Sequence, residues 1–191
     1  IYLESPSSNI FVIQDLRAIA ALAQQHGIKT VIDNTWATPI FQNPLTLGID
    51  YVVHSATKYL GGHSDLLGGV VIGDEAHMNK LTNEERAFYG GVMDPHSAWL
   101  LIRSLRTLKI RMKQHEESAL AVAEFLQAHP KVKQVFYPGL PAHPHYEIGK
   151  TQMSGYSGLL SFILDVENEK AVKVIKNLRF VEEGPSWGGF E

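Results

Sequence analysis

Mostly apolar runs, each short enough for one strand, recur through the first third of the chain. An amphipathic stretch from Asp15 to about His26 lies between the first two runs, and Gly27 follows it where helices commonly end. Strands that are apolar on both faces and alternate with helices are typical of a parallel sheet covered on both sides. The runs that predict strands are IYLE, KTVID, DYVVHS and GGVVIG.

Helical periodicity takes over after Asp74. It predicts one helix over residues 75–88 and helical structure throughout residues 95–128, with Pro95 at a first helical position and Pro130 just past the end. The second stretch is long for one globular helix. It is either two helices or a single long helix that joins two domains.

The last third of the chain indicates a second, smaller structural unit. Two strand-like apolar runs flank a polar segment rich in Gly and Pro, which predicts a loop, and a helical segment follows. We place a domain boundary near residue 129, so that residues 1–129 and 130–191 form parts of two domains. In chain order these segments are VKQVFYP, LPAHPHYEIGKTQMSGYSG, GLLSFIL and NEKAVKVIKNL.

The composition is that of an ordinary globular protein. Of 191 residues, 45% are hydrophobic and 19% are charged, the formal net charge is −3, and cysteine is absent. These values argue against a disordered chain, a nucleic-acid partner, a disulfide framework and a thiolate metal site. No apolar run approaches the roughly 18 residues of a membrane span, so we expect no membrane partner and a cytoplasmic location.

Both ends of the sequence look interrupted. The chain begins with IYLESP, already in strand-like sequence and without an initiator methionine, and it stops at GGFE directly after a glycine turn. We therefore expect an internal piece of a longer protein, with parts of the active site outside this sequence.

Polar side chains follow two of the predicted strands where each strand ends. Asp33 closes KTVID, Ser55 closes DYVVHS, and Thr57 and Lys58 come directly after. Ligands of open parallel sheets bind at the carboxyl ends of the strands, so these residues are expected to share one crevice. Hydroxyls can bind phosphate oxygens, a lysine amine can form an imine with an aldehyde, and a carboxylate can pair with a protonated ring nitrogen. The set matches the requirements of pyridoxal phosphate.

Each of these residues also has an ordinary alternative role. An aspartate at a strand end is more often a turn or cap residue, a lone lysine is usually solvated, and Ser-x-Thr is a common sequence. No GxxxxGK[ST] phosphate loop occurs. His54 and His63 lack zinc-site spacing and are interpreted as structural or as neighbours of the site. His143 and His145 lie in the Pro-rich segment and are expected to be exposed, so no metal site is predicted.

A longer stretch of the sequence supports a pyridoxal-phosphate site more strongly than these residues do singly. The sequence contains DNT and SATKYLGGHSD, which resemble the lysine segment of the Cys/Met-metabolism (trans-sulfuration) family of pyridoxal-phosphate enzymes. The resemblance extends from YLESP to SWGGFE, nearly the whole chain, although family subunits are considerably longer. It implies an α/β fold of the aspartate aminotransferase type (fold type I). The chain would form part of the large, mainly parallel-sheet, cofactor-binding domain with a long linking helix, and part of a smaller α+β C-terminal domain.

The resemblance also implies a role for each matching residue. Lys58 is similar to the Schiff-base lysine and main proton carrier, and Asp33 is similar to the partner of the pyridine nitrogen. Ser55 and Thr57 are similar to phosphate ligands. Ser186, in SWGG, matches a serine near the substrate carboxylate and the lysine.

Two departures from common family patterns narrow the prediction. Many members have Asn-Pro after the first strand, where this chain has Ser8 and Asn9, so Ser8 is the candidate contact of the ring oxygen. Trp36 in DNTW and Trp187 in SWGG resemble bacterial cystathionine β-lyases more than γ-lyases, and Trp187 becomes a candidate substrate contact. Aromatic packing around a pocket is the alternative role of both tryptophans.

The resulting expectation is a lyase of sulfur amino acids in methionine biosynthesis and cysteine metabolism. The resemblance implies pyridoxal 5'-phosphate as cofactor, a small amino-acid substrate, and a homotetramer built as a dimer of dimers. It implies α,β-elimination of cystathionine to homocysteine, pyruvate and ammonia. Cystathionine γ-lyase, methionine γ-lyase, cystathionine γ-synthase and O-acylhomoserine sulfhydrylase activities remain alternatives within the family. A truncated, non-catalytic binding module is the alternative of a different class.

Overall fold

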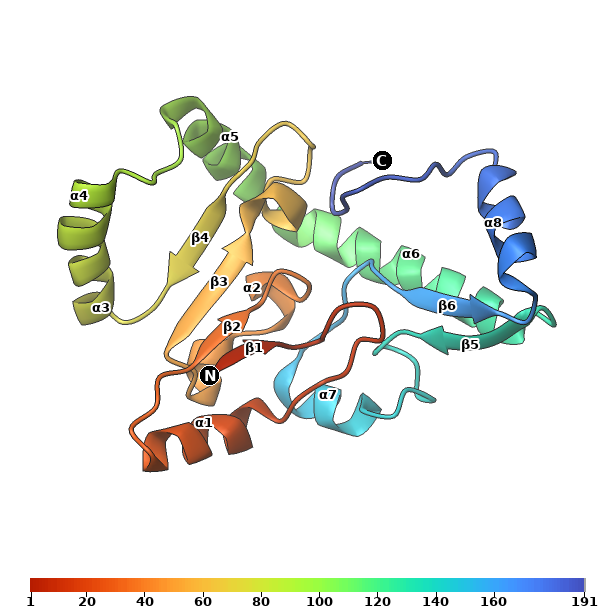
Figure 1. Ribbon diagram of the computed structural model, residues 1–191, viewed down its shortest axis with the longest axis horizontal. Helices are drawn as coiled ribbons and strands as arrows, with labels where there is room; N and C mark the ends of the chain where they lie inside the picture. Colours follow the sequence, from red (N-terminus) through yellow and green to blue (C-terminus); the bar gives the residue numbers. More distant parts are fainter. Residues whose placement is uncertain (191) are drawn as a thin grey trace.

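A four-stranded sheet forms the first part of the molecule. The computed structural model describes residues 1–190, and its strands β1 (Tyr2–Glu4), β2 (Val31–Asp33), β3 (Tyr51–Ser55) and β4 (Gly69–Ile72) lie in that order (Figure 1). The first three strands are parallel, with Asp33 paired to Glu4 on one side and to Val53 on the other. The predicted α/β class with mainly parallel strands is confirmed.

The fourth strand departs from the prediction of a parallel sheet. β4 runs antiparallel to β3. The reason lies in residues 56–68, because Ala56 N donates a hydrogen bond to Gly68 O at 2.8 Å and so holds both ends of this connection side by side. A parallel neighbour would need a crossover to the opposite end of the sheet, and this connection makes none.

Helix α1 (Leu16–Gln25) connects β1 to β2 and matches the prediction closely. The side chain of Asp15 accepts a hydrogen bond from Ala18 N and caps the start of the helix. At the other end Gly27 has φ +63°, the left-handed conformation that glycine adopts without steric cost. Leu16 is fully buried on the face of the helix that packs on the sheet.

Helical segments follow β4 along the chain (Figure 1). The predicted helix 75–88 is a continuous helical stretch made of α3 (Glu75–Lys80), the π-helical turn η3 (Leu81–Glu85) and α4 (Arg86–Tyr89). The residues at both junctions keep right-handed helical dihedral angles, so the chain does not break there.

The longer helical stretch is two helices. They are α5 (Pro95–Leu105) and α6 (Leu108–Ala128), with a break at Arg106 and Thr107. Pro95 occupies the first turn of α5, and the preceding Asp94 caps it by accepting hydrogen bonds from two backbone N–H groups. The periodicity left the choice between one helix and two open, and the structure shows two.

The rest of the described chain builds on an antiparallel pair of strands, β5 (Val132–Phe136) and β6 (Ser161–Leu164). The segment between them was predicted to be a loop, but it contains helix α7 (Tyr146–Gln152). Gln152 explains the difference, because its side chain is buried, accepts a hydrogen bond from Leu16 N and donates one to the carbonyl of Gln14. These contacts across more than a hundred residues are invisible to local composition. The predicted final helix is present as α8 (Asn168–Lys176).

Three short helical turns have no counterpart in the sequence prediction. Each is only four or five residues long, too short for a periodicity to develop. They are α2 (Thr38–Phe41), the 3₁₀ turn η1 (Pro44–Leu47) and the π-helical turn η2 (Ala56–Leu60).

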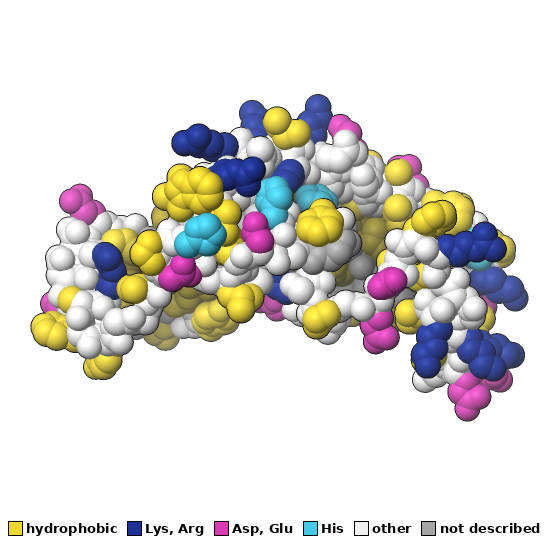
Figure 2. All heavy atoms as spheres, turned by 90° about the horizontal axis from the view of Figure 1, so that it is seen from above, with side chains coloured by type: hydrophobic (Ala, Val, Ile, Leu, Met, Phe, Trp, Pro, Cys, Tyr) yellow, Lys and Arg dark blue, Asp and Glu magenta, His cyan; other side chains and the backbone are white. Residues whose placement is uncertain are grey.

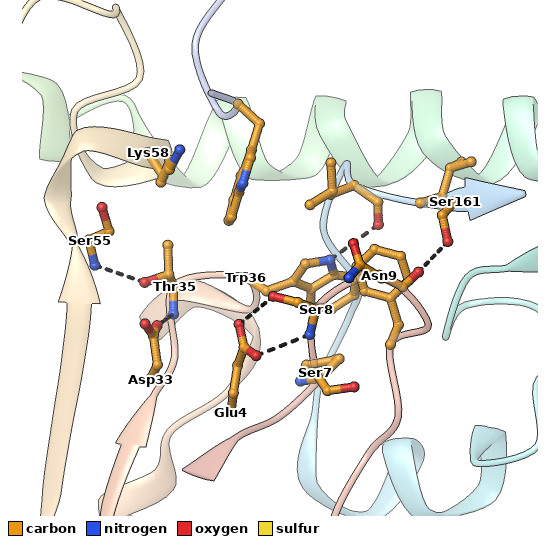
Figure 3. Close-up of a pocket in the computed structure, with 15 residues that line it drawn as sticks. Glu4, Ser7, Ser8, Asn9, Asp33, Thr35, Trp36, Ser55, Lys58 and Ser161 are labelled. Carbon is orange, nitrogen blue, oxygen red and sulfur yellow. Dashed lines mark hydrogen bonds between the residues drawn. The ribbon is translucent and has the colours of Figure 1, made fainter. Parts of the chain in front are cut away.

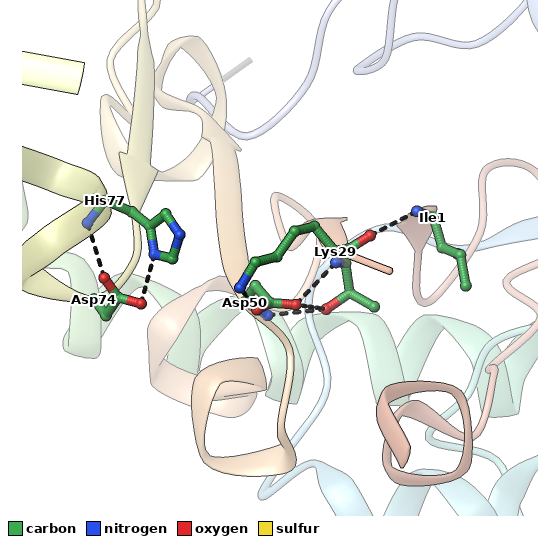
Figure 4. A network of polar contacts seen from close by, with 6 residues as sticks. Ile1, Lys29, Asp50, Asp74 and His77 are labelled. Atoms are coloured by element: carbon green, nitrogen blue, oxygen red, sulfur yellow. Dashed lines mark hydrogen bonds and ion pairs between the residues drawn. The ribbon is translucent and has the colours of Figure 1, made fainter. Parts of the chain in front are cut away.

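A polar network fastens the amino ends of the strands, opposite the end where the strands β1 to β3 finish (Figure 4). Lys29 Nζ lies 2.6 Å from Asp50 Oδ1, and the amide and hydroxyl of Thr30 both donate to Asp50 Oδ2. Burial acts to raise the pKa of the Asp50 carboxyl, but the hydrogen bonds from Lys29 and Thr30 outweigh it and lower the pKa to about 2. The Ile1 amino group completes the network by donating to the carbonyl of Lys29.

One hydrophobic cluster crosses the position of the predicted domain boundary. It unites residues from both sides of position 129, among them Phe11, Trp36, Ala119, Tyr137 and Met153. The division at 129 stays a prediction.

Among the described helices, none has both the length and the apolar composition that crossing a membrane requires.

Candidate functional site

A cavity of about 390 Å³ opens at the carboxyl ends of β1, β2 and β3 (Figure 3). Each of these strands contributes its last residue to the lining, namely Glu4, Asp33 and Ser55. The position agrees with the rule that open parallel sheets bind ligands at this end. The remaining lining residues are Pro6, Ser7, Ser8, Asn9, Phe11, Thr35, Trp36, Lys58, Leu159, Leu160, Ser161 and Trp187.

Hydrogen bonds link the ends of β2 and β3 beneath the cavity (Figure 3). Asp33 Oδ1 accepts from Thr35 N at 2.8 Å, and Thr35 Oγ1 accepts from Ser55 N at 2.8 Å. Within residues 1–190, Asp33 Oδ2 has no hydrogen-bond donor. One carboxylate oxygen therefore orients the side chain, and the other is free to meet a ligand.

Lys58 reaches the cavity from the turn η2. Its backbone has φ −84° and ψ −130°, so Lys58 interrupts the helical geometry of the turn that contains it. The amine donates a hydrogen bond to Ser186 Oγ at 2.8 Å and lies 5.2 Å from the centre of the Trp187 ring. Residues 128 positions apart in the sequence thus meet at one nitrogen atom.

The hydroxyl of Thr57 is turned toward the chain beside it. Gly68 N donates to Thr57 Oγ1 at 3.1 Å, and Thr57 Oγ1 lies 3.5 Å from Gly68 O. Thr57 does not contribute to the cavity lining, whereas Ser55 does. The structure therefore gathers Ser8, Asp33, Ser55, Lys58 and Trp187 around the cavity, reaches Ser186 through Lys58, and leaves Thr57 at its edge.

Glu4 is a cavity residue that the sequence analysis missed. Ser8 Oγ donates to Glu4 Oε1 at 2.8 Å, and Ser8 N lies 3.1 Å from Glu4 Oε2 (Figure 3). In the sheet Glu4 pairs directly with Asp33. The argument that selected Asp33 as a polar residue at a strand end applies equally to Glu4, so the signal was present. The Ser8 hydroxyl is engaged by this carboxylate.

Gly188 was also missed, and it lies against the backbone of the lysine turn. Its φ is +91°, and a Cβ atom there would lie 2.7 Å from Tyr59 N and 2.9 Å from the carbonyl carbon of Lys58. Only glycine allows residues 186–188 to approach this closely. Trp187 packs edge-on against the Tyr59 ring at 5.2 Å, so the segment is held by ring contact as well.

Tyr59 ties the lysine turn to the segment before β6. The Tyr59 side chain is buried, and its hydroxyl accepts a hydrogen bond from Gly158 N at 3.0 Å. Burial raises the pKa of the Tyr59 hydroxyl, so it stays protonated. The ring of His115 lies on another side of Tyr59 at 5.0 Å. Tyr59 thus fixes the turn from several directions.

Trp36 has the aromatic packing role that was given as the alternative for both tryptophans. It is 6% exposed, its indole Nε1 donates to Leu159 O at 3.1 Å, and its ring packs 5.9 Å from that of Phe11. Packing therefore fixes the side chain, and one part of it still lines the cavity.

The burial of His54 agrees with its interpretation, and the burial of His143 corrects the expectation that it is exposed. His54 is 3% exposed inside the sheet, in agreement with a structural role. His143 was expected to be exposed but is 7% exposed. It lies in turns closed by hydrogen bonds from His143 N to Leu140 O and from Tyr146 N to His143 O, and its Nδ1 accepts from the backbone N–H of His145. Burial lowers the pKa of His143. Within residues 1–190, no three His, Cys, Asp or Glu side chains gather where they could hold one metal ion.

Comparison with known proteins gives a consistent result. The model of the family described as "Cys/Met metabolism PLP-dependent enzyme" matches residues 1–191. The chain is 43% identical over 192 residues to a cystathionine beta-lyase of Coxiella burnetii, covering 100% of this chain and 50% of the relative. It is 40% identical over 190 residues to the chloroplastic cystathionine gamma-synthase 1 of Arabidopsis thaliana, covering 100% of this chain and 34% of the relative.

Solved structures give the same picture. A cystathionine gamma synthase from Xanthomonas oryzae pv. oryzae, in complex with aminoacrylate and cysteine, superposes with a TM-score of 0.95 at 38% identity, covering 100% of this chain and 49% of that one. A cystathionine gamma-lyase from Lactobacillus plantarum, complexed with L-serine, gives 0.94 at 38%, covering 100% and 50%. The chain spans about half the length of most curated relatives it matches.

Proposed function

The chain belongs to the Cys/Met metabolism family of pyridoxal-phosphate-dependent enzymes, and on this premise we propose that the whole protein is a carbon–sulfur lyase. Its reaction is the α,β-elimination of cystathionine to homocysteine, pyruvate and ammonia. One observation carries the proposal: the Lys58 amine stands beside a cavity that Asp33 and Ser55 also line, with Ser186 and Trp187 against the amine.

The residues around the cavity fit pyridoxal phosphate. Lys58 offers a primary amine for its aldehyde, Asp33 offers a free carboxylate oxygen for its ring nitrogen, and Ser55 offers a hydroxyl for its phosphate. When bound, the cofactor withdraws electrons from the α-carbon of an attached amino acid and makes its proton acidic. Thr57, whose hydroxyl already meets Gly68, would join the phosphate contacts after a change of partner.

Lys58 carries the protons in this scheme. Once the substrate amine has taken its place on the aldehyde, the freed Lys58 amine would remove the proton from the α-carbon, and the carbon–sulfur bond at the β-carbon would then break. Lys58 returns the proton to the leaving sulfur, so that homocysteine departs as a neutral thiol. Water converts the remaining three-carbon skeleton to pyruvate and ammonia. Ser186 accepts a hydrogen bond from the amine and limits the directions in which it can point.

The resemblance of Trp36 and Trp187 to bacterial cystathionine β-lyases supports the choice of β-elimination. The Trp187 ring lies 5.2 Å from the Lys58 nitrogen, within the range of a cation–π contact.

A γ-specific activity is the second candidate. The relatives include a cystathionine gamma-lyase of Bacillus subtilis that is 41% identical to this chain, so sequence similarity does not separate the two reactions. γ-Elimination of cystathionine, with uptake of water, releases 2-oxobutyrate, ammonia and cysteine. γ-Replacement forms cystathionine from an O-acylhomoserine and cysteine and releases the acyl group as its carboxylic acid.

A product assay on the intact protein with pyridoxal phosphate tests these proposals. Release of pyruvate from cystathionine, together with a visible absorbance band that disappears in Lys58→Ala, supports the β-lyase. Release of 2-oxobutyrate supports γ-chemistry instead. A protein with neither the band nor either product is the non-catalytic binding module.

We also propose that the whole protein assembles as a homotetramer. Large apolar side chains of α4 and α5 are exposed, including Phe88, Tyr89, Trp99 and Ile102, and Figure 2 shows apolar side chains at several places on one face. Light scattering during size-exclusion chromatography gives the mass, and a monomer at micromolar concentration contradicts the proposal.

The cytoplasmic location stays a prediction that cell fractionation tests.

A further inference from the structure

One arginine of helix α6 holds the turn that carries Lys58. Arg111 Nη1 donates to the carbonyl of Tyr59, the residue after Lys58, at 2.7 Å. Its Nη2 lies 3.2 Å from Ser104 O and 3.0 Å from Ser104 Oγ, and its Nε donates to Thr107 Oγ1 at 3.1 Å. The guanidinium therefore joins the lysine turn to the junction between α5 and α6.

Ser104 extends this attachment by one more carbonyl group. Its side chain is 4% exposed, and its hydroxyl donates to Gly61 O. Arg111 and Ser104 together bind the carbonyls of residues 59 and 61, while Gly62 N donates to the carbonyl of Lys58 itself at 2.8 Å. The backbone at Lys58 and on its carboxyl side is thus held by hydrogen bonds at three carbonyl groups, those of residues 58, 59 and 61.

The chain leaves space for the guanidinium at Gly62. This glycine has φ +65°, and a Cβ atom there would lie 2.2 Å from Arg111 Nη1. Any other residue at position 62 would have to displace the guanidinium or distort the turn. Glycine at position 62 is therefore what allows the Arg111 guanidinium to lie so close to the turn.

The acceptors around Arg111 are all neutral. Within residues 1–190 no carboxylate lies within ion-pair distance of its guanidinium, and burial lowers its pKa without removing its charge. His115 is the ionisable group whose pKa responds to it: burial lowers the pKa of His115, and the nearby Arg111 charge lowers it further. A cation held only by carbonyls and hydroxyls depends on the directions of its N–H groups. A lysine amine, which has no planar fork, cannot reproduce those directions.

We propose that Arg111 is a positioning residue for Lys58. This inference rests on the proposed function, in which the Lys58 amine binds the cofactor aldehyde. By fixing the carbonyl of Tyr59, Arg111 sets the path of the turn and hence the point from which the Lys58 side chain enters the cavity. A purely structural role, in which Arg111 only completes the end of α5 by binding Ser104 O, would affect stability and leave the amine unchanged.

Arg111→Lys in the intact protein, with Arg103→Lys as the matched control, separates these roles. Arg103 lies on α5, the helix whose end Arg111 binds, and its side chain is exposed. The first measurement is the rate at which cofactor-free protein gains its visible band with pyridoxal phosphate. The second, made without cofactor, is the acylation rate of Lys58 against pH, measured on its peptide by mass spectrometry.

We expect folded Arg111→Lys to gain the band about tenfold more slowly and to show an altered acylation profile, because a small displacement of a reacting group has large effects on rate. Arg103→Lys should match the wild type in both measurements. If Arg111→Lys melts at a lower temperature but matches the wild type in both, the positioning role is overturned.

Ser104→Ala provides a second variant if Arg111→Lys does not fold. It removes the hydroxyl that accepts from Arg111 Nη2 and donates to Gly61 O, and so loosens the guanidinium that binds the Tyr59 carbonyl. We expect a change in the same direction of about threefold, and no change in either measurement contradicts the proposal. A wild type without any Lys58-dependent band would refute the proposed function instead, and the acylation profiles would still test Arg111.

Discussion

His54 and Ser55 are neighbours on β3, yet they serve opposite faces of the sheet, because successive side chains of a strand point to opposite sides. On the cavity face, Ser55 and Asp33 are either hydrogen-bonded or open to the cavity. On the other face, His54 is 3% exposed and both of its ring nitrogens lack a partner within the described part of the chain. Gln42, 1% exposed, likewise has a side-chain oxygen without a partner there.

The comparison shows that burial alone does not mark a functional residue. The cavity face keeps groups that can exchange protons or bind charge within reach of a ligand. The opposite face holds a titratable group in its neutral form, because burial lowers the pKa of His54 more than the Asp33 charge raises it. Changes on the cavity face should therefore affect chemistry, and changes on the opposite face should affect stability.

The largest effect is expected from Lys58→Ala. In the proposed function, this change removes both the amine that binds the cofactor aldehyde and the proton carrier, so the elimination rate should fall by at least about 10³-fold. The product assay and the visible band measure this loss. Lys29→Ala is the control, since this lysine pairs with Asp50 at the other end of the strands. A comparable loss in Lys29→Ala, or retained activity in Lys58→Ala, would show that the cavity is not the site.

The two carboxylates at the strand ends should differ in their effects. Asp33→Asn keeps the acceptor for Thr35 N but removes the charge that, in the proposed function, would face the ring nitrogen, and we expect kcat to fall about 10²-fold. Glu4→Gln weakens the attachment of Ser8 and should change cofactor affinity by about threefold, with kcat nearly unchanged. Steady-state kinetics at several cofactor concentrations separate the two effects. Equal losses of kcat would assign Glu4 a direct role.

Gly188→Ala tests whether the final segment must touch the lysine turn. The added Cβ would clash with Tyr59 N at 2.7 Å, so residues 186–188 should move away from Lys58 and the rate should fall about tenfold. Gly184→Ala is the matched control, because nothing lies within 4 Å of a Cβ at position 184. Equal rates for the two variants would mean that the contact has no part in the reaction.

The smallest effect belongs to the opposite face and appears in the pH dependence of stability. The unfolded chain protonates His54 near pH 6.5, whereas the folded protein resists protonation, so the free energy of unfolding is retained above that pH and falls below it. In His54→Leu this fall should become smaller, and stability at neutral pH should stay within about 1 kcal/mol. Urea unfolding at about pH 7.5 and about pH 5.5 measures both.

His115 and His143 also have pKa values lowered by burial, so some acid sensitivity should remain in that variant. An acid-side decrease identical to that of the wild type would remove His54 from the explanation. The activity of His54→Leu at neutral pH should remain close to that of the wild type, which distinguishes it from every change on the cavity face.

Local sequence was sufficient for much of the fold. Asp15 and Gly27 marked the ends of α1, and four apolar runs marked the strands of the first sheet. Helix α7 was not predictable, because its Gln152 is held by backbone groups near α1 rather than by neighbours in sequence. The direction of β4 was not predictable either, since an apolar run has the same pattern in a parallel and in an antiparallel strand.

The sequence by itself supplied the residues on which the proposed chemistry depends: the strand-end residues Asp33 and Ser55, the lysine that follows them, and the two stretches, DNT and SATKYLGGHSD, that resemble the family. Only the tertiary structure decided their surroundings. It turned Thr57 toward Gly68, brought Ser186 to the Lys58 amine and placed Arg111 behind the lysine turn. Residue types fix the available donors, acceptors and charges, whereas distances between segments far apart in the chain follow from packing, which no local pattern contains.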